Sequence, residues 1–151
     1  IGPEISVKKA NVHPEYFTKK FVDLAVVTLE KDIHPEDYDN VAYAELQTQE
    51  LPLGSKVRVF GWGRQIGDDK TSLSDDLKKT TLFVRRSDEP HYIVANSTYS
   101  NDCYGDSGGP LESSDGKLAG IVSRGSEPYC PIGDTNYYTK VSDFVPWIMA
   151  Q

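Results

Sequence analysis

The sequence predicts one all-β domain built as a barrel or a sandwich. Short runs rich in β-branched and aromatic residues recur along the chain, and clusters of turn-forming residues separate them. A chain of 151 residues, of which 38% are hydrophobic and 26% charged, is long enough to bury one core. No internal repeat or low-complexity tract interrupts this pattern.

Each expected element follows from its local pattern. Six runs are predicted to be strands, at residues 5–7, 24–29, 57–61, 80–84, 118–123 and 137–141, and turn chemistry falls at 67–70, 88–90, 114–116 and 133–136. The run 24–29 is almost continuously apolar, so we expect it to be buried on both faces. The one helix expected lies at the C terminus, with Ser142 as its N-cap and Pro146 in its first turn. Its apolar face comprises Phe144, Trp147 and Ile148.

The composition argues against two classes of partner. The formal net charge is −7 and the pI about 4.9, with no long run of lysine or arginine, so the electrostatic footprint of a nucleic-acid-binding protein is missing. No stretch reaches the ~20 apolar residues needed to span a bilayer, and the first residues do not form a signal peptide. We therefore expect neither nucleic acid nor membrane as a partner, and we interpret the chain as a mature or processed segment.

Two cysteines and a sequon favour a secreted protein. If Cys103 and Cys130 are paired, closing the loop between them contributes about 3 kcal/mol in the chain-entropy model, although one pair alone does not fix the compartment. Asn96 opens an Asn-Ser-Thr glycosylation sequon, which adds support for secretion.

The string Gly-Asp-Ser-Gly-Gly-Pro at residues 105–110 carries the chemistry of the chain. A serine nucleophile needs backbone N–H groups close to the developing oxyanion, and flanking glycines permit that approach because they have no side chain. We therefore predict that Ser107 is the nucleophile of a serine hydrolase, with the N–H groups of Gly105 and Ser107 as its oxyanion hole.

With this motif the sequence resembles the chymotrypsin/trypsin family of serine proteases, and further landmarks follow in the family's order. They are Val-His-Pro-Glu-Tyr at 12–16, Asp-Leu-Ala-Val-Val at 23–27, Val-Phe-Gly-Trp-Gly at 59–63, Gly-Ile-Val-Ser at 120–123, and Tyr-Thr-Lys-Val at 138–141 leading to Trp147 and Ile148. The resemblance spans nearly the whole chain. It implies a chymotrypsin-like double six-stranded antiparallel β-barrel, with residues 1–50 as the end of the first barrel and residues 51–151 as the second barrel and terminal helix.

The resemblance also implies catalytic roles. Asp23 corresponds to the acid that orients the catalytic histidine, Ser123 to the serine that faces this acid, and Asp106 to the aspartate that pairs with a new amino terminus after zymogen cleavage. The family order is His, Asp, Ser, so the histidine is expected upstream of Ile1, on an N-terminal partner chain from the same precursor. Ile1 is then an internal cleavage or chain start in a loop of the first barrel.

Three histidines within the chain are alternatives for the base. His13 and His34 each precede a proline, which favours extended or turn structure and surface positions. His91 lies between Asp23 and Ser107, so the Asp, His, Ser order of subtilisin-type enzymes is formally available. No other feature of the sequence resembles subtilisin.

Alignment of the sequence with the family on Ser107 implies which residues line a substrate pocket. Its expected lining comprises Asn101, Asp102, Tyr104, Ser123, Arg124, Gly125 and Asn136, braced by a disulfide between Cys103 and Cys130. Asn101 forms the base, Asn136 narrows the floor, and Asp102 is predicted to give a weak preference for lysine or arginine. Arg124 replaces the family's tryptophan and removes a flat apolar wall. A competing hypothesis is that its guanidinium reaches an unpaired pocket acid and occludes the site.

The expected function is that of a secreted serine endopeptidase that forms an acyl-enzyme on Ser107 and is inactive without the histidine-bearing chain. Its partners would be polypeptide substrates and protein protease inhibitors, with no cofactor and no metal. The alternative is a catalytically inactive, protease-like binding protein, favoured by the unusual residues at 101, 124 and 136. A non-peptidase serine esterase fits the nucleophile but not the order of the landmarks.

Overall fold

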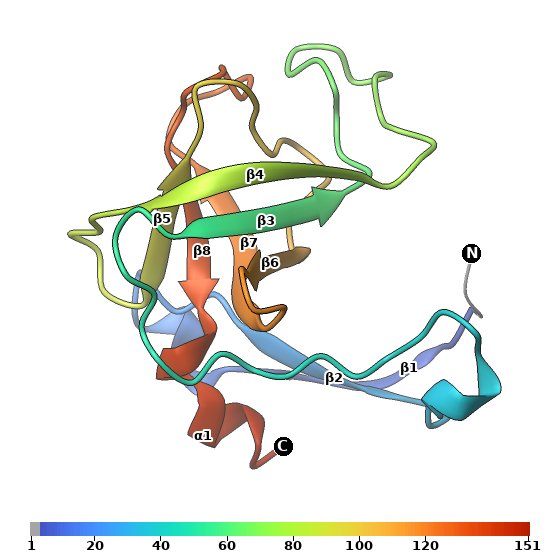
Figure 1. Ribbon diagram of the computed structural model, residues 1–151. Coiled ribbons are helices and arrows are strands. Elements are labelled where there is room, and N and C mark those ends of the chain that lie inside the picture. Colours follow the sequence, from blue (N-terminus) through green and yellow to red (C-terminus); the bar gives the residue numbers. More distant parts are fainter. Residues whose placement is uncertain (1–3) are drawn as a thin grey trace.

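The larger part of the chain forms a closed antiparallel barrel. The computed structural model describes residues 4–151, and the interpretation of Ile1 as an internal start lies outside them. The barrel strands are β3 (Lys56–Gly61), β4 (Lys78–Arg85), β5 (Tyr92–Asn96), β6 (Pro110–Ser113), β7 (Leu118–Gly125) and β8 (Asn136–Lys140). Their order is β3-β4-β5-β8-β7-β6, and β6 closes on β3 (Figure 1). The predicted all-β fold with a six-stranded second barrel is confirmed.

Alternating side chains fill this barrel. Val57 and Val59 of β3 are 0% and 3% exposed, and Leu82 and Val84 of β4 are 0% and 5% exposed, while the residues between them are more accessible. The other buried members of the core are Ile93, Ala95, Leu111, Ala119, Val122 and Tyr138. Because fully burying one large aliphatic side chain stabilises a fold by about 1.5–3 kcal/mol, this core gives the loops at its ends a rigid base.

The first part of the chain forms a separate two-stranded sheet, in which β1 (Val7–Val12) pairs antiparallel with β2 (Ala25–Leu29). The 3-10 helix η1 (Pro14–Phe17) lies between them. The strand predicted at 5–7 is misplaced, because pairing with β2 rather than apolar character defines β1. The expectation that 24–29 is buried on both faces is wrong: β2 pairs only with β1 (Figure 1), and each of its residues is exposed or half-buried.

A small second core fixes the segment before β2 against the C terminus. Val22 and Leu24 are 2% and 5% exposed and form a cluster with Phe144. Trp147 and Ile148 pack against the same cluster, so the predicted apolar face of the terminal helix is confirmed.

The C-terminal helix is shorter than expected. A 3-10 turn, η3 (Val141–Asp143), precedes one α-helical turn, α1 (Val145–Ile148), and the proline of α1 lies in its first turn as predicted. Ser142 is not the N-cap. It lies inside η3, because Val141 is fully buried and Phe144 N donates to the Val141 carbonyl at 2.9 Å. None of the helices within residues 4–151 has the length and apolar character to cross a membrane.

The segment from 30 to 55 leads from the small sheet to the barrel. It contains the 3-10 helix η2 (Pro35–Asp37), and it contacts the barrel where Leu46 lies beside Leu118. Gln47 N donates to Leu118 O at 2.9 Å there. The predicted division of the chain at residue 50 stays a prediction.

Candidate active site

Ser107 is exposed on a tight loop that leads into β6. Backbone hydrogen bonds fix this loop at two points: Asp106 N donates to Cys103 O at 3.0 Å, and Gly108 N donates to Val122 O at 2.9 Å. Gly108 has a φ of +80°, a left-handed conformation that favours glycine. The serine hydroxyl therefore sits on a backbone that is both tightly turned and anchored to β7.

The two predicted oxyanion donors belong to the same loop. Gly105 has a φ of +99°, and a Cβ at this position would lie 3.2 Å from Cα of Gly63, so the site requires glycine. Within residues 4–151, neither Gly105 N nor Ser107 N donates to another group of the protein. Two uncommitted N–H groups beside an exposed serine are what oxyanion stabilisation needs.

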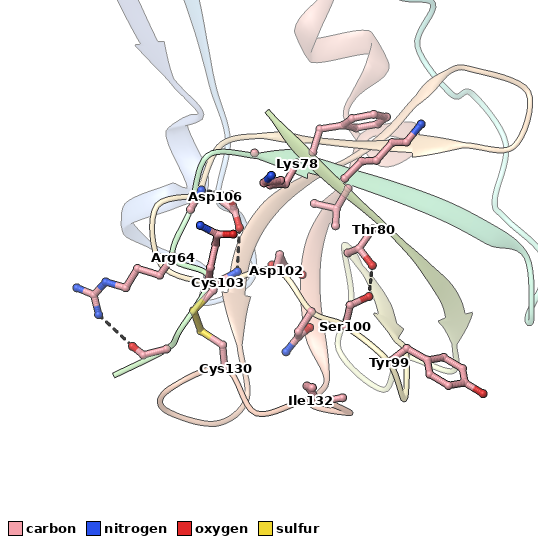
Figure 2. Close-up of a pocket in the computed structure, with 18 residues that line it drawn as sticks. Arg64, Lys78, Thr80, Tyr99, Ser100, Asp102, Cys103, Asp106, Cys130 and Ile132 are labelled. Atoms are coloured by element: carbon pink, nitrogen blue, oxygen red, sulfur yellow. Dashed lines mark hydrogen bonds between the residues drawn. A yellow bond between two sulfur atoms is a disulfide. The ribbon is translucent and has the colours of Figure 1, made fainter. Parts of the chain in front are cut away.

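The carboxylate of Asp106 anchors the loop that carries Gly105 and Ser107. It accepts hydrogen bonds from Gly63 N at 2.8 Å and from Cys103 N at 2.9 Å (Figure 2). A Cβ at Gly61 would lie 1.8 Å from Asp106 Oδ1 and one at Gly63 2.5 Å from Asp106 Cγ, so these glycines make room for the carboxylate. Sequence reasoning missed their role, although the Gly-Trp-Gly string at 61–63 was a signal. Asp106 also lines a cavity of about 350 Å³, and its pairing with an amino terminus stays a prediction.

Asp23 lies against the barrel although it belongs to the segment just before β2 of the small sheet. Ser123 Oγ donates to Asp23 Oδ2 at 2.7 Å, and Thr139 Oγ1 donates to Asp23 O at 2.7 Å. Val22 and Leu24 on either side are buried in the second core, so the backbone on both sides of the acid is fixed. The structure thus brings together Asp23 and Ser123, which are 100 positions apart in the sequence.

Tyr92 extends this network, and nothing in the sequence pointed to it. Its ring is 5% exposed, packed edge-on against Phe21 and Tyr137 at centroid distances of 6.2 and 5.8 Å. Its hydroxyl lies 3.3 Å from Ser123 Oγ. Because Ser123 has a single hydroxyl proton and donates it to Asp23, the Tyr92 hydroxyl is the donor to Ser123. Two successive hydrogen bonds therefore end on the Asp23 carboxylate.

His13 is buried, so the surface position expected for it is wrong. Its ring packs against Phe144 and Trp147 at centroid distances of 5.3 and 4.7 Å, and its Nδ1 accepts from Glu15 N at 3.2 Å. The proline that follows begins η1, which turns the ring inward onto the C-terminal cluster.

The other two histidines also lie away from Ser107. His34 precedes η2, with Nδ1 3.8 Å from Glu36 Oε1, and His91 Nδ1 lies 2.9 Å from Asp143 Oδ2. All three histidines are among the described residues, and none of their side chains forms a hydrogen bond or an ion pair with Ser107 or Asp23. Within residues 4–151, no group of three or more His, Cys, Asp or Glu side chains is placed to hold a metal ion.

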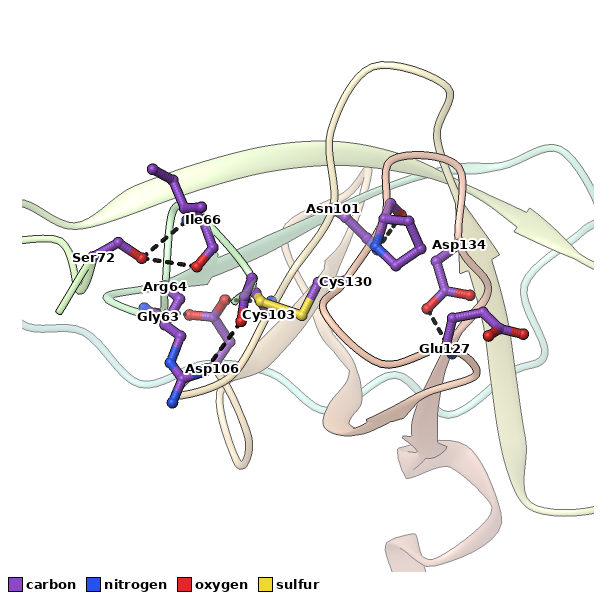
Figure 3. Close-up of a disulfide and its surroundings, with 12 residues drawn as sticks. Gly63, Arg64, Ile66, Ser72, Asn101, Cys103, Asp106, Glu127, Cys130 and Asp134 are labelled. Atoms are coloured by element: carbon purple, nitrogen blue, oxygen red, sulfur yellow. Dashed lines mark hydrogen bonds between the residues drawn. A yellow bond between two sulfur atoms is a disulfide. The ribbon is translucent and has the colours of Figure 1, made fainter. Parts of the chain in front are cut away.

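A cavity of about 400 Å³ opens beside Ser107. Six of the seven predicted lining residues border it: Asp102, Tyr104, Ser123, Arg124, Gly125 and Asn136. Asn101 instead lines the neighbouring cavity, where its Oδ1 accepts from Asn136 Nδ2 and its Nδ2 donates to Pro131 O at 3.2 Å. The predicted disulfide Cys103–Cys130 is confirmed, with the two Cα atoms 5.5 Å apart (Figure 3).

One buried acid of this cavity is Asp102, which is 7% exposed and accepts a hydrogen bond from the Tyr138 hydroxyl. Burial raises the pKa of Asp102 from 3.8 to about 6; the hydrogen bond from Tyr138 opposes this rise, and the charges of Asp106 and Asp134 add to it. Burial and the adjacent Asp102 raise the pKa of Tyr138, so the phenol stays a donor. The charge of the cavity therefore changes near pH 6.

Asp134 is a second buried acid of the cavity, and the sequence indicated only a turn at this position. It is 7% exposed, and its carboxylate accepts from Glu127 N at 3.1 Å (Figure 3). It also accepts from Thr135 N at 2.6 Å and from Ser126 Oγ. These three donors leave it little capacity for a ligand. Its role is to hold the loop between β7 and β8 in shape.

Arg124 does not reach a pocket acid, so the self-occlusion hypothesis is wrong. Its Nη2 pairs with Glu89, and its Cζ lies 3.8 Å from the ring centroid of Tyr137 and 5.5 Å from that of Tyr92. Burial alone would lower the pKa of Arg124, but the hydrogen bond and charge of Glu89 outweigh it, so the pKa lies above its ordinary value. A bulge in β7 explains the direction of the side chain: Val122 pairs with Tyr138, and the next paired residue, Arg124, lies opposite Tyr137.

These features together define a class of protein. An exposed serine on a glycine-rich loop, two uncommitted N–H groups beside it, and an acid hydrogen-bonded to a strand of the closed antiparallel barrel form the framework of a chymotrypsin-like serine protease domain. The sequence model described as Trypsin matches residues 2–148. The chain belongs to the trypsin family.

The curated relatives are consistent with this membership. The kallikrein-like enzyme LV-Ka of Lachesis muta muta is 32% identical over 124 residues, covering 74% of this chain and 63% of the relative. Human kallikrein-7 is 31% identical, covering 95% and 60%, and phenoloxidase-activating factor 3 of Holotrichia diomphalia is 30% identical, covering 96% and 47%. The chain thus spans 47–63% of the length of these relatives.

Solved structures agree with the fold. Neuropsin, a serine protease of mouse brain, superimposes with a TM-score of 0.85 at 25% identity, covering 98% of this chain and 71% of neuropsin. Human heparin binding protein has a TM-score of 0.82 at 22% identity, covering 97% and 66%, which shows a shared fold alone.

Proposed function

We propose that this chain is part of a secreted serine endopeptidase that hydrolyses peptide bonds through an acyl-enzyme on Ser107. The observation that carries the proposal is the exposed Ser107 hydroxyl beside two uncommitted N–H groups, on a loop anchored by Asp106. Ser107 Oγ would attack the scissile carbonyl while a histidine takes its proton. The N–H groups of Gly105 and Ser107 would hold the oxyanion until the amine leaves with that proton. Water would then release the acyl group.

The base is proposed to come from an N-terminal chain of the same precursor, which completes the first barrel. A two-stranded sheet is marginal on its own, and this one exposes apolar side chains: Val7, Val12 and Val27 are 54%, 43% and 52% exposed. Asp23 is exposed as well, and Ser123 occupies only one of its oxygens, Oδ2. The other oxygen, Oδ1, is left to hold a histidine ring in its reactive orientation. Without that partner the chain should be inactive.

The proposed cleavage preference is a weak one for lysine or arginine. Asp102 lines the cavity beside Ser107, and Tyr138 donates to only one of its oxygens. A buried carboxylate gains most from a cationic neighbour when it is charged, which for Asp102 means above about pH 6. The Asn101–Asn136 pair next to it adds polar, uncharged groups.

Secretion, zymogen activation and glycosylation complete the proposal. The disulfide Cys103–Cys130 suits an oxidising compartment, and one relative is named a venom plasminogen activator. Asn96 ends β5, where its Oδ1 accepts from Arg85 Nε at 2.8 Å, and the sequon residue Thr98 is exposed. Asp106 lines a cavity into which a new amino terminus would insert, and protein inhibitors would bind at the cavity beside Ser107.

The decisive experiment is labelling the assembled, activated protein with a fluorophosphonate. We expect one label on the peptide that contains Ser107, complete loss with Ser107→Ala, and full labelling with Ser114→Ala, an exposed serine on the β6–β7 turn. Absence of label from a correctly folded sample would refute the peptidase and favour the alternative, a protease-like binding protein.

A further inference from the structure

Arg124 presents a cation to the cavity that also contains Ser107. Its side chain is 40% exposed, so the pair with Glu89 does not close it off from solvent. An arginine has five N–H donors, and within residues 4–151 the hydrogen bond to Glu89 through Nη2 is the one that it makes. Most of its donors are therefore available to a ligand, on a guanidinium whose Cζ lies 3.8 Å from the Tyr137 ring centroid.

The edge of β7 offers an extended peptide a place beside this guanidinium. β7 pairs with β6 only as far as Ile121, and Val122 bonds to the backbone of Gly108 and Gly109. Beyond that point Arg124 and Gly125 pair on the β8 side alone. A peptide that adds as a strand to this edge places alternate side chains on the Arg124 face of the sheet.

The acids that line the cavity do not pair with Arg124, whose partner is Glu89. Asp134 is committed to three donors, and Asp102 is buried under the Tyr138 hydroxyl. Glu127 is the exposed acid of the lining, and Glu89 is the acid already paired with Arg124. Among the described residues that line this cavity, Arg124 is the only cation.

We propose that Arg124 recognises a carboxylate side chain, Asp or Glu, at one of the positions two to four residues before the scissile bond. The inference rests on the proposed peptidase and specifies its substrates: an acid upstream of the cleaved residue. The substrate carboxylate would bind the donors that Glu89 leaves uncommitted, above the Tyr137 ring.

The test compares peptide pairs that differ only by Asp against Asn, or Glu against Gln, at each of these three positions. On the complete activated protein we expect kcat/KM for the acidic peptide to exceed that for its amide by about fivefold at one position, since charge-assisted bonds are weakened by partial exposure. Arg124→Gln should bring the ratio to one, and Glu89→Gln should increase it because the guanidinium loses its competitor. Rising salt should reduce it.

A charge-swapped protein separates recognition from a structural role. Arg124→Glu combined with Glu89→Arg keeps an ion pair but reverses the charge at the cavity, so it should prefer lysine over glutamine where the parent prefers glutamate. Each ratio is measured on one protein, so any loss of overall activity cancels. The inference would be overturned if the unsubstituted protein cleaved the acidic peptide and its amide with equal kcat/KM, or if its preference for the acidic peptide persisted in Arg124→Gln.

A binding measurement keeps the inference testable if the protein does not cut peptides. In the complete protein carrying Ser107→Ala, fluorescence anisotropy should show tighter binding of the acidic peptide than of its amide, and Arg124→Gln should abolish that difference. Equal binding of both peptides overturns the role of Arg124. Missing fluorophosphonate label with acid-selective binding refutes only the peptidase.

Discussion

Replacing Asp102 by asparagine should stabilise the protein at neutral pH and leave its stability unchanged in acid. Burial raises the pKa of this carboxyl from 3.8 to about 6, so the native state binds its proton more tightly than the unfolded state does. Below pH 3.8 both states are protonated and the group has no effect. Between about pH 4 and pH 6 the unfolded chain gives up the proton first, and native stability falls as pH rises.

The magnitude follows from the two pKa values. Since one pKa unit corresponds to about 1.4 kcal/mol, a rise from 3.8 to about 6 costs the native state roughly 3 kcal/mol above pH 6. Asp102 is 7% exposed, so solvent screening takes little from this figure. Asparagine keeps an oxygen that accepts from Tyr138, so the hydrogen bond survives while the buried charge disappears.

Urea unfolding of the complete protein at a series of pH values measures this effect, with Ser107→Ala as the background to prevent self-cleavage. The gain in unfolding free energy from Asp102→Asn should grow from near zero at pH 4 to about 3 kcal/mol at pH 7.5. Asp115→Asn is the control, because Asp115 is exposed and the hydrogen bond from Ser113 lowers its pKa instead. A difference that stays flat, or falls, between pH 4 and 7.5 would refute the reasoning.

Three further predictions concern the hydrogen bonds that lead from Tyr92 to Asp23, the loop that carries Ser107, and the core of the barrel. Tyr92→Phe removes the first of the two successive hydrogen bonds that end on Asp23. Steady-state kinetics should therefore show kcat lowered about threefold with KM unchanged. The control Tyr99→Phe, at an exposed position, should lower neither. An effect on KM alone would contradict this. Gly61→Ala places a Cβ 1.8 Å from Asp106 Oδ1 and should slow fluorophosphonate labelling of the protein about tenfold or more; an unchanged rate would argue against Asp106 as the anchor. Leu82→Ala should cost about 2–5 kcal/mol in urea unfolding, whereas Leu53→Ala, at a 69% exposed position, should cost under about 1 kcal/mol.

The strands that sequence predicted are those with a recognisable pattern. β3 and β4 alternate between buried and accessible residues, which is the signal of a half-buried strand. β5 has four buried residues in succession, and β6 begins with a proline after two glycines, so neither shows alternation. The exposure of β2 could not be predicted, for a different reason. A run of apolar residues predicts a strand that packs against another layer, but it does not show whether that layer is present in the structure.

The serine loop could be predicted because its residues are contiguous, whereas the partners of Arg124 could not. Glu89 lies 35 positions from Arg124, in the loop before β5, and becomes its neighbour because β8 pairs with both β5 and β7. Arg124 directly follows Ser123 in the sequence, and this position alone predicts a guanidinium beside the pocket acids. Side-chain direction in a strand depends on register, and a register shift of one residue reverses it.

The bulge in β7 is therefore the feature on which the site depends. In an unbroken ladder, the residue after Val122 would lie opposite Tyr137, and Arg124 would lie opposite Asn136, which lines the cavity. With Ser123 as the extra residue, its hydroxyl is directed to Asp23 while Arg124 stacks on Tyr137. One inserted residue thus lets adjacent positions of a single strand serve two purposes, since Ser123 donates to the Asp23 carboxylate and Arg124 presents a cation to the cavity beside Ser107.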